Sequence, residues 1–422
     1  MDIIKNDILN EKMYKKEYEN GLRAYIMPKV GYKKTFAMFA TNFGSINDKF
    51  MLPDTNETIN VPDGVAHFLE HKLFSMKDGS AMDKFAEMGS SSNAYTSFTH
   101  TSYLFSCTSG FEDSFKLLLD FVQNPYITEE SVENEKGIIG QEIRMYEDDP
   151  DWQVYFNFIN CLYNDFSVKK DIAGTVESIS GIDRDLLYKC FKTFYDPSNM
   201  VIFVVGDVNP EEVYDIIEEK VDTNKEKLEI KKIYTEEKEN IASKRKEAVC
   251  DVSMPIFMYG FKVDPKIENI IKTEISLDII LEMLTGKSSN LYEELYESGL
   301  ITSPLGVDIT LEKEYAFFNI SGESREVDKV VEKIKNAIVN MKENGVDEES
   351  FERIKKRLIG DYIRQFNSVD KISHMFMANI FRGVDIFEYV NAYQDINISD
   401  IEEVMNKYFD FEKEAVSIVK PA

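Results

Sequence analysis

The chain has 422 residues, more than one hydrophobic core usually supports, so we expect two domains or a repeated pair of halves. Its 76 acidic residues outnumber its 49 basic ones, the formal net charge is -27, and no stretch gathers Lys and Arg with aromatic residues, so nucleic acid and membrane surfaces are not expected partners. The longest apolar run, Met200 to Val205, is too short to cross a bilayer, and the N-terminus lacks the apolar core of a secretion signal, which predicts a cytoplasmic location.

The first half of the chain alternates between predicted strands and predicted helices. An Asn20-Gly21 turn ahead of the apolar stretch Leu22 to Met27 indicates a β-hairpin near the N-terminus. The hydrophobic pattern then predicts, in chain order, a strand over Thr35 to Asn42, helices over 65–74 and 80–88, a strand over Ala94 to Cys107, helices over 111–123 and 129–146, a strand over Met200 to Val205 and a helix from Glu211. This mixture favours an α+β protein.

A change of composition marks a domain boundary. Residues 218–247 are rich in Lys and Glu and poor in large apolar residues, which is typical of a solvated linker. The sequence after it repeats the plan of the first half, because strands are predicted over Ile256 to Val263 and Val416 to Val419. Aligning Gly89 with Gly299 sets MDKFAEMG against YEELYESG. We therefore predict an N-terminal domain over 1–217 and a similar C-terminal domain over 248–422.

The helix predicted over 65–74 carries the pattern H-x-x-E-H. His67, Glu70 and His71 occupy positions i, i+3 and i+4 and so project from one face of a helix. Neutral imidazoles are good zinc ligands, and a nearby carboxylate can accept a proton from water that the metal acidifies. The pattern is the reverse of the H-E-x-x-H metalloprotease motif, with the same division of roles. It predicts a catalytic zinc site with Glu70 as general base.

Two histidines leave such a site one protein ligand short. The helix predicted over 129–146 offers Glu135 and Glu142, which are seven residues apart and therefore two turns apart on one face. Spacing alone leaves both carboxylates open as the third ligand.

Three segments together resemble the pitrilysin-type zinc metallopeptidases, the insulinase-like family M16. They are GVAHFLEHKLF over 64–74, NAYTSFT over 93–99 and the helix with Glu135 and Glu142. The resemblance implies two similar α+β domains, each an antiparallel sheet with helices packed on one face, in the LuxS/MPP-like metallohydrolase fold. It also implies that Glu142 is the third zinc ligand, that Glu135 orients the site from behind the ligands, and that Glu70 is the base.

The strand that begins at Ser91 is the predicted place for substrate. Its small side chains would let a peptide backbone pair with its edge, and the family resemblance implies that this strand holds substrate by main-chain hydrogen bonds. Asn93 and Ala94 are accordingly the predicted substrate-binding residues.

These patterns predict a zinc-dependent endopeptidase, with Zn2+ as cofactor, that hydrolyses oligopeptides or short unfolded segments. The chain is most similar to the zinc-motif member of paired small bacterial proteins of this family. An alternative is a non-catalytic scaffold or assembly subunit of the same fold, although loss of H-x-x-E-H would be expected there and the motif is intact. A hydrolase acting on a non-peptide amide is a third reading.

The second half lacks the metal pattern. Aligning Gly89 with Gly299 places Leu277, Ile280 and Leu281 opposite the three motif residues. Pitrilysin-type enzymes usually carry an Arg and a Tyr around a Gly-Leu pair in this half, and the corresponding positions here are Leu295 and Thr302. Neither side chain can stabilise an oxyanion across a cavity. We therefore expect a homologous partner subunit, most simply in a heterodimer, with a homodimer as the other possibility. The alternative is that the alignment is shifted by a few residues or that Tyr292 or Tyr296 takes over the role.

Overall fold

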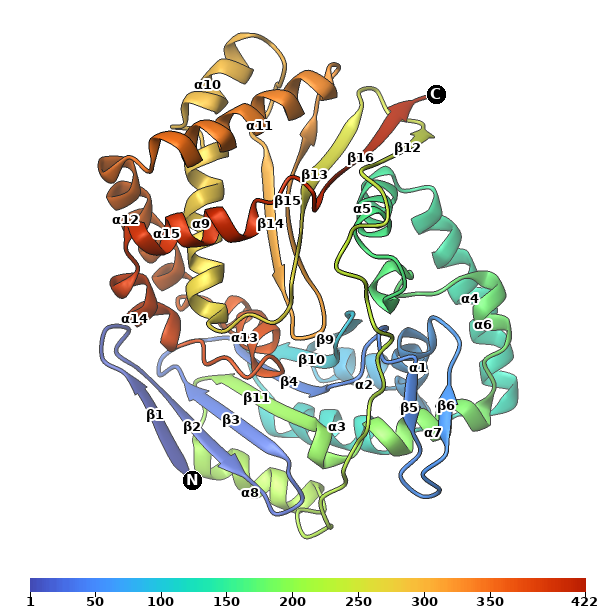
Figure 1. Ribbon diagram of the computed structural model, residues 1–422. Helices are drawn as coiled ribbons and strands as arrows, with labels where there is room; N and C mark the ends of the chain where they lie inside the picture. Colours follow the sequence, from blue (N-terminus) through green and yellow to red (C-terminus); the bar gives the residue numbers. More distant parts are fainter. The chain divides into compact units, whose positions relative to one another are not determined.

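The computed structural model describes residues 1–422, and the chain divides into two compact units. Unit 1 comprises Met1–Ile143, Lys170–Thr235 and Gln365–Ile386, and unit 2 comprises Arg144–Lys169, Glu236–Arg364 and Phe387–Ala422. Each unit is built on one principal β-sheet with helices packed against it, and Figure 1 labels these elements. No helix combines the length and apolarity needed to cross a membrane.

The principal sheet of unit 1 has seven strands in the order β1-β2-β3-β11-β4-β10-β9. Their bounds are β1 Asp2–Asn6, β2 Glu11–Glu17, β3 Arg23–Pro28, β4 Thr35–Thr41, β9 Ser91–Thr96, β10 Thr101–Cys107 and β11 Met200–Gly206. Neighbouring strands run antiparallel except β3 and β11, which are parallel. Two short hairpins add β5 Lys49–Met51 with β6 Thr58–Asn60, and β7 Ser75–Met76 with β8 Gly79–Ser80. Strand β9 ends the principal sheet and leaves one edge free of strand pairing.

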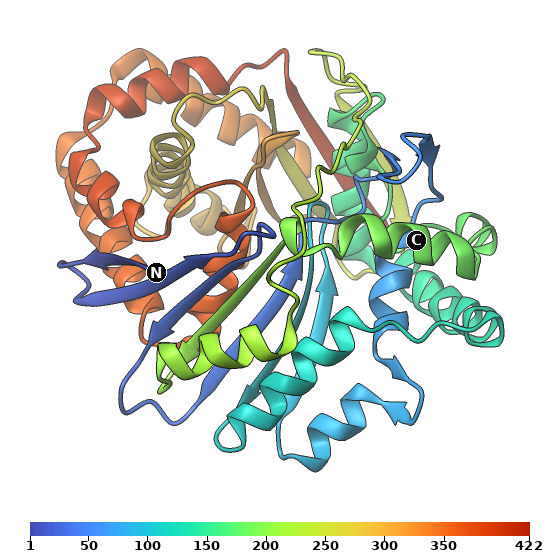
Figure 2. The same ribbon diagram turned by 90° about the horizontal axis from the view of Figure 1, so that it is seen from below.

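Several helices of unit 1 contact strands of this sheet, among them α1 Val65–Leu73, α2 Ala81–Glu87, α3 Phe111–Gln123 and α8 Pro210–Lys220. Helix α7 Arg184–Phe194 packs on α1, and the chain also forms α4 Glu129–Glu147 and α6 Val176–Ser180. In Figure 2 the teal α3 and the lime α8 lie side by side against the sheet. Alternate residues such as Phe39 and Ile202 enter the apolar core on this side, because successive side chains of a strand point to opposite faces.

The opposite face of the same sheet is covered by α13, Val369–Ile380. Phe376 of this helix stacks on Phe203 of β11, with ring centroids 4.1 Å apart, and also contacts Tyr25 of β3. With both faces covered, every residue of β4 and β11 is buried. Their near-continuous apolar sequence follows from this double burial.

Unit 2 has a five-stranded sheet in the order β12-β16-β13-β15-β14. Its strands are β12 Arg245–Cys250, β13 Ile256–Val263, β14 Gly306–Leu311, β15 Ala316–Glu323 and β16 Glu414–Pro421, with β12 and β16 parallel. Its helices are α5 Pro150–Leu162, α9 Ile270–Thr285, α10 Asn290–Glu297, α11 Val327–Asn344, α12 Glu348–Gln365, α14 Glu388–Asp395 and α15 Ile398–Tyr408. Helix α5 packs on β12, β13 and β16, while α9 packs on β14 and α15 on β13.

Each unit thus contains one helix that a linear division of the sequence assigns to the other half. Helix α5 precedes residue 217 yet belongs to unit 2, and α13 follows residue 248 yet belongs to unit 1. Periodicity reveals that such a helix is amphipathic, but it does not reveal which sheet the helix covers. The division into 1–217 and 248–422 remains a prediction about the repeat in the sequence, whereas the compact units interleave two segments.

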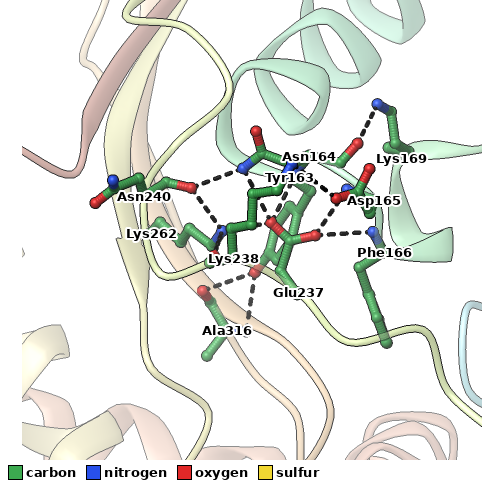
Figure 3. A network of polar contacts seen from close by, with 10 residues as sticks. All are labelled: Tyr163, Asn164, Asp165, Phe166, Lys169, Glu237, Lys238, Asn240, Lys262 and Ala316. Atoms are coloured by element: carbon green, nitrogen blue, oxygen red, sulfur yellow. Dashed lines mark hydrogen bonds and ion pairs between the residues drawn. The ribbon is translucent and has the colours of Figure 1, made fainter.

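The charged stretch over 218–247 is held at several points. Residues on its N-terminal side add to the β5 edge in unit 1, where Met51 N donates to Lys231 O at 3.0 Å. Further along, Glu237 belongs to unit 2, and Figure 3 shows its carboxylate facing the backbone nitrogens that follow α5. It accepts hydrogen bonds of 2.8–2.9 Å from the backbone N–H groups of Asn164, Asp165 and Phe166. It also forms an ion pair with Lys262 at 2.7 Å. A stretch that looks like a free linker in sequence is therefore anchored.

One predicted strand is two strands in the structure. The segment from Ala94 to Cys107 divides into β9 and β10, which pair antiparallel through a turn over residues 97–100. The turn is closed by Ser97, whose N donates to His100 O at 2.8 Å and whose Oγ accepts from His100 N at 3.0 Å. Side-chain bonds of this kind let Ser compete with a strand ladder, and no Gly or Pro marks the turn in the sequence.

The predicted hairpin near the N-terminus and the predicted internal repeat both have structural counterparts. Strands β2 and β3 pair antiparallel, and Gly21 between them adopts a φ of 87°. Helices α2 and α10 are each followed by a glycine with positive φ, at 73° for Gly89 and 70° for Gly299. The two glycines that the alignment equates therefore occupy the same local geometry.

Candidate metal centre

Helix α1 places the three side chains of the H-x-x-E-H pattern on one face. Its first residues follow Gly64, whose φ is 91° and whose absent Cβ would lie 2.3 Å from the carbonyl oxygen of Ala173, so only glycine fits there. Phe68 and Leu69 anchor the helix in the core of unit 1. The i, i+3 and i+4 positions then present His67, Glu70 and His71 together.

Helix α4 brings two carboxylates to the same place. Ile139 and Ile143 are buried in the core and fix the rotation of the helix. Glu135 and Glu142, two turns apart, are then directed toward α1, where Glu135 meets His71 and Glu142 meets both histidines.

The predicted ligands lie at distances that suit a small tetrahedral cation. His67 Nε2 is 3.7 Å from Glu142 Oε1, and His71 Nε2 is 3.5 Å from Glu142 Oε2. One ligand atom from each of these residues lies within 4.8 Å of the others. Tetrahedral zinc with bonds of about 2.0–2.2 Å holds its ligand atoms roughly 3.3–3.6 Å apart. The three residues could therefore hold zinc with little movement.

Glu135 lies behind the predicted ligands. Its Oε1 is 3.1 Å from His71 Nδ1, and its Oε2 accepts a hydrogen bond from Lys72 Nζ at 3.0 Å. Burial alone would raise the pKa of Glu135, but the hydrogen bonds with His71 and Lys72 outweigh burial and lower it. Burial opposes protonation of His71, but its hydrogen bond with Glu135 and the neighbouring carboxylates raise the pKa of His71.

The predicted base, Glu70, is only 8% exposed. Its Oε2 accepts a hydrogen bond from Thr96 Oγ1 of β9 at 2.7 Å. Burial raises the pKa of Glu70, as expected for a carboxylate moved away from water. Burial and the nearby His71 lower the pKa of His67 to about 4, so this imidazole is neutral near pH 7, the state in which it binds a metal.

Two contacts of this site were missed by the sequence reasoning. Lys72 directly follows H-x-x-E-H and is only 3% exposed, while Thr96 lies in the NAYTSFT segment. A lysine at a helix position that must face the core is the signal that could have indicated a buried partner for Glu135.

The predicted substrate residues lie on the free edge of the principal sheet of unit 1. Asn93 and Ala94 belong to β9, which pairs with β10 on one side only. The N–H of Ala94 donates to Oδ1 of Asn93 at 2.9 Å.

Two histidines outside the motif lie in aromatic surroundings in unit 1. The ring of His100 is buried, with Nδ1 3.0 Å from Ser97 Oγ and a tilted contact to Phe381. His374 lies against Phe36 and Tyr95.

Comparison with known proteins places most of the sequence within one family. Residues 55–176 match the sequence model of Insulinase (Peptidase family M16), and residues 181–358 match that of the Peptidase M16 inactive domain. The uncharacterized zinc protease YmfH of Bacillus subtilis is 41% identical over 423 residues, covering 99% of each chain. The zinc protease PqqE of Helicobacter pylori is 24% identical over 383 residues, covering 87% of this chain and 85% of its own.

Solved structures agree with the sequence matches. A crystal structure of an M16-like peptidase from Alicyclobacillus acidocaldarius is 31% identical, has a TM-score of 0.91, and is matched over 98% of this chain and 99% of its own. A protease from Helicobacter pylori has the same fold, with a TM-score of 0.81 at 21% identity over 97% of this chain and 100% of its own. With these matches running the length of the chain, the protein belongs to peptidase family M16.

Proposed function

We propose that this chain is a zinc-dependent endopeptidase that hydrolyses oligopeptides or short unfolded segments. The observation that carries the proposal is the convergence of His67, His71 and Glu142 at distances that suit zinc. The buried carboxylate of Glu70 lies in the same turn of α1 as the two histidines. Relatives named zinc proteases, YmfH and PqqE, support the identity of the metal.

The proposed hydrolysis needs a metal held by three ligands and a base that accepts a proton from water. Zinc held by His67, His71 and Glu142 would supply Lewis acidity, which polarises a peptide carbonyl and makes a nearby water easier to deprotonate. Glu70 accepts the proton of the attacking water and later delivers it to the leaving amine. Its burial favours this exchange, because a carboxylate with a raised pKa holds a proton more readily than one in water.

Substrate binding is assigned to the free edge of β9. An extended peptide would add as a further strand, with main-chain hydrogen bonds to Asn93 and Ala94. This mode favours unfolded segments, since a folded protein rarely presents a free extended strand. Strand pairing depends on the main-chain geometry of the peptide more than on the identity of its side chains.

A homologous partner subunit is part of the proposal. Leu295 of α10, which stands where the family usually has Arg, is fully buried and has no donor, and Thr302 is short and exposed. A donor to a developing oxyanion is commonly worth about 3–4 kcal/mol. A partner of the same family could supply these groups in a heterodimer, and a second copy of this chain could not.

The proposal is tested with purified protein and a library of unfolded peptides. We expect bound zinc, slow cleavage by the chain alone, loss of cleavage with a chelator and recovery when zinc is restored. A co-expressed homologue that lacks H-x-x-E-H should accelerate cleavage strongly. Bound zinc with no cleavage under any of these conditions would contradict the peptidase proposal and favour a scaffold role.

A further inference from the structure

The two carboxylate oxygens of Glu70 have different surroundings. Oε2 accepts the hydroxyl hydrogen bond of Thr96 at 2.7 Å. This bond joins α1 to β9, two elements that are 26 residues apart at these positions. A hydroxyl that donates to one oxygen of a carboxylate restricts rotation of the group and leaves the other oxygen, Oε1, for proton transfer.

The hydroxyl of Thr96 is itself held in place. Its Oγ1 lies 3.3 Å from Oγ1 of Thr101, the residue opposite it in the β9–β10 hairpin. Thr101 is fully buried and donates to the carbonyl oxygen of Phe43 at 2.8 Å. Because Thr101 is committed to that carbonyl, and because the contact from Thr96 to Glu70 is the shorter one, the hydrogen of Thr96 is directed to Glu70.

Thr96 belongs to the same strand as the proposed substrate residues. Ala94 and Thr96 are two residues apart and so face the same side of β9, toward the core that includes α1. The strand proposed to pair with the peptide is therefore also the strand that holds the proposed base. A shift of β9 along α1 would change the position of Glu70 as well as that of the peptide.

We propose that Thr96 is a positioning residue that fixes Glu70 through Oε2, keeps Oε1 free for the proton of water, and couples the base to the peptide-binding strand. The inference rests on the proposed function, because it needs Glu70 to be the base. It adds a role for a residue outside the H-x-x-E-H pattern.

The test replaces the hydroxyl while keeping the shape. Thr96→Val removes the donor, Thr96→Ser keeps it, and Thr99→Val is the matched control, because Thr99 lies in the same hairpin and its hydroxyl contacts His100 instead of Glu70. Hydrogen bonds to charged groups contribute enough to change a rate by roughly 10- to 100-fold. We expect kcat to fall by about that factor in Thr96→Val, with KM and zinc content unchanged, and to stay near the wild-type value in Thr96→Ser and Thr99→Val.

A double-mutant cycle with Glu70→Gln separates the possible failures. If Thr96 acts through Glu70, Thr96→Val should cause no further loss in the Glu70→Gln background. An equal loss in both backgrounds, an unchanged kcat in Thr96→Val, or a rise in KM alone would overturn the positioning role. Full activity in Glu70→Gln would instead overturn the proposed function. If Thr96→Val does not fold, Thr96→Ser decides. A fall in kcat of about 10-fold or more in a normally folded Thr96→Ser protein, which keeps the donor, would overturn the proposal.

Discussion

The carboxylate of Glu135 lies 3.1 Å from Nδ1 of His71, so the same imidazole directs its Nε2 toward Glu142. The other ring of the motif has no such support, because Nδ1 of His67 is buried and has no hydrogen-bond partner. A hydrogen bond at Nδ1 fixes the tautomer and orientation of a ligand histidine. We therefore infer that Glu135 orients one imidazole of the pair, and Lys72 donates a hydrogen bond to Glu135 in turn.

Lys72→Met should lower the stability of the protein. The substitution leaves the carboxylate of Glu135, only 13% exposed, without its cation, and breaking a buried ion pair in this way commonly costs about 3 kcal/mol. Chemical denaturation of the metal-free protein measures the change. Lys84→Met is the matched control, because its ion pair with Asp78 is exposed and should contribute little. An equal fall in the free energy of unfolding in Lys72→Met and Lys84→Met would contradict a stabilising role for the buried pair of Lys72 and Glu135.

Metal content should follow the geometry of the site. We expect about one zinc per chain in the wild-type protein, by mass spectrometry, and little in His67→Ala or His71→Ala. Glu142→Gln should weaken zinc binding more than Glu135→Gln, because the first removes a ligand and the second only an orienting hydrogen bond. The reverse order would mean that Glu135 is the ligand and Glu142 the orienting residue. Full zinc occupancy in a variant that lacks both His67 and His71 would contradict the assignment of the metal site.

Glu237 should make stability depend on pH in the acid range. Burial would raise its pKa, but hydrogen bonds from Asn164, Lys262 and the neighbouring backbone N–H groups lower it to about 2. A depressed pKa stabilises the folded state above the unfolded pKa of roughly 4.3, and this contribution is lost as the pH falls toward 2. Glu237→Gln should therefore reduce the free energy of unfolding at pH 7 and flatten its decline between pH 5 and pH 2.

The control for that measurement is Glu239→Gln, since Glu239 is an exposed residue of the same stretch. It should leave both the stability at pH 7 and the acid dependence unchanged. The same acid dependence in Glu237→Gln as in the wild type would contradict the anchoring role of Glu237.

Helix α13 should stabilise unit 1 although it lies within the second half of the sequence. Phe376→Ala removes a ring that stacks on Phe203, and truncation of a buried Phe commonly costs about 3–5 kcal/mol. The surface control Val30→Ala, at a side chain 87% exposed, should change little. Hydrogen exchange should show that the amides of β4 and β11 lose protection in Phe376→Ala. A loss of protection confined to unit 2 would contradict the assignment of α13 to unit 1.

Much of the fold was predictable from sequence because its signals are local. The buried strands β4, β11 and β13 have apolar runs of strand length, and α3 has a clean helical period, so their bounds were predicted to within a residue or two. The division between β9 and β10 was missed because Ser97 closes the turn with its side chain, without Gly or Pro. The exchange of α5 and α13 depends on tertiary packing, which no local pattern encodes.

In the candidate site, too, the local sequence predicted some residues and tertiary packing determined the others. His67, Glu70 and His71 lie within one helical turn, so their spacing alone predicted that they share a face. Glu142 required the family resemblance, since Glu135 has the same helical phase and only the packing of α4 decides which carboxylate lies between the two histidines. The contact between Thr96 and Glu70 becomes visible only when α1 and β9 are brought together, whereas the core-facing position of Lys72 in its helix was a signal already present in the sequence.

The most direct test of the account is the hydrolysis of an unfolded peptide by Glu70→Gln, with zinc content measured on the same sample. The amide has nearly the shape of the carboxylate but cannot accept a proton from water. We predict a full complement of zinc, an unchanged unfolding temperature, and a fall in kcat of several orders of magnitude. Wild-type turnover by a zinc-loaded, folded Glu70→Gln protein would contradict the central claim that Glu70 is the base of a metallopeptidase.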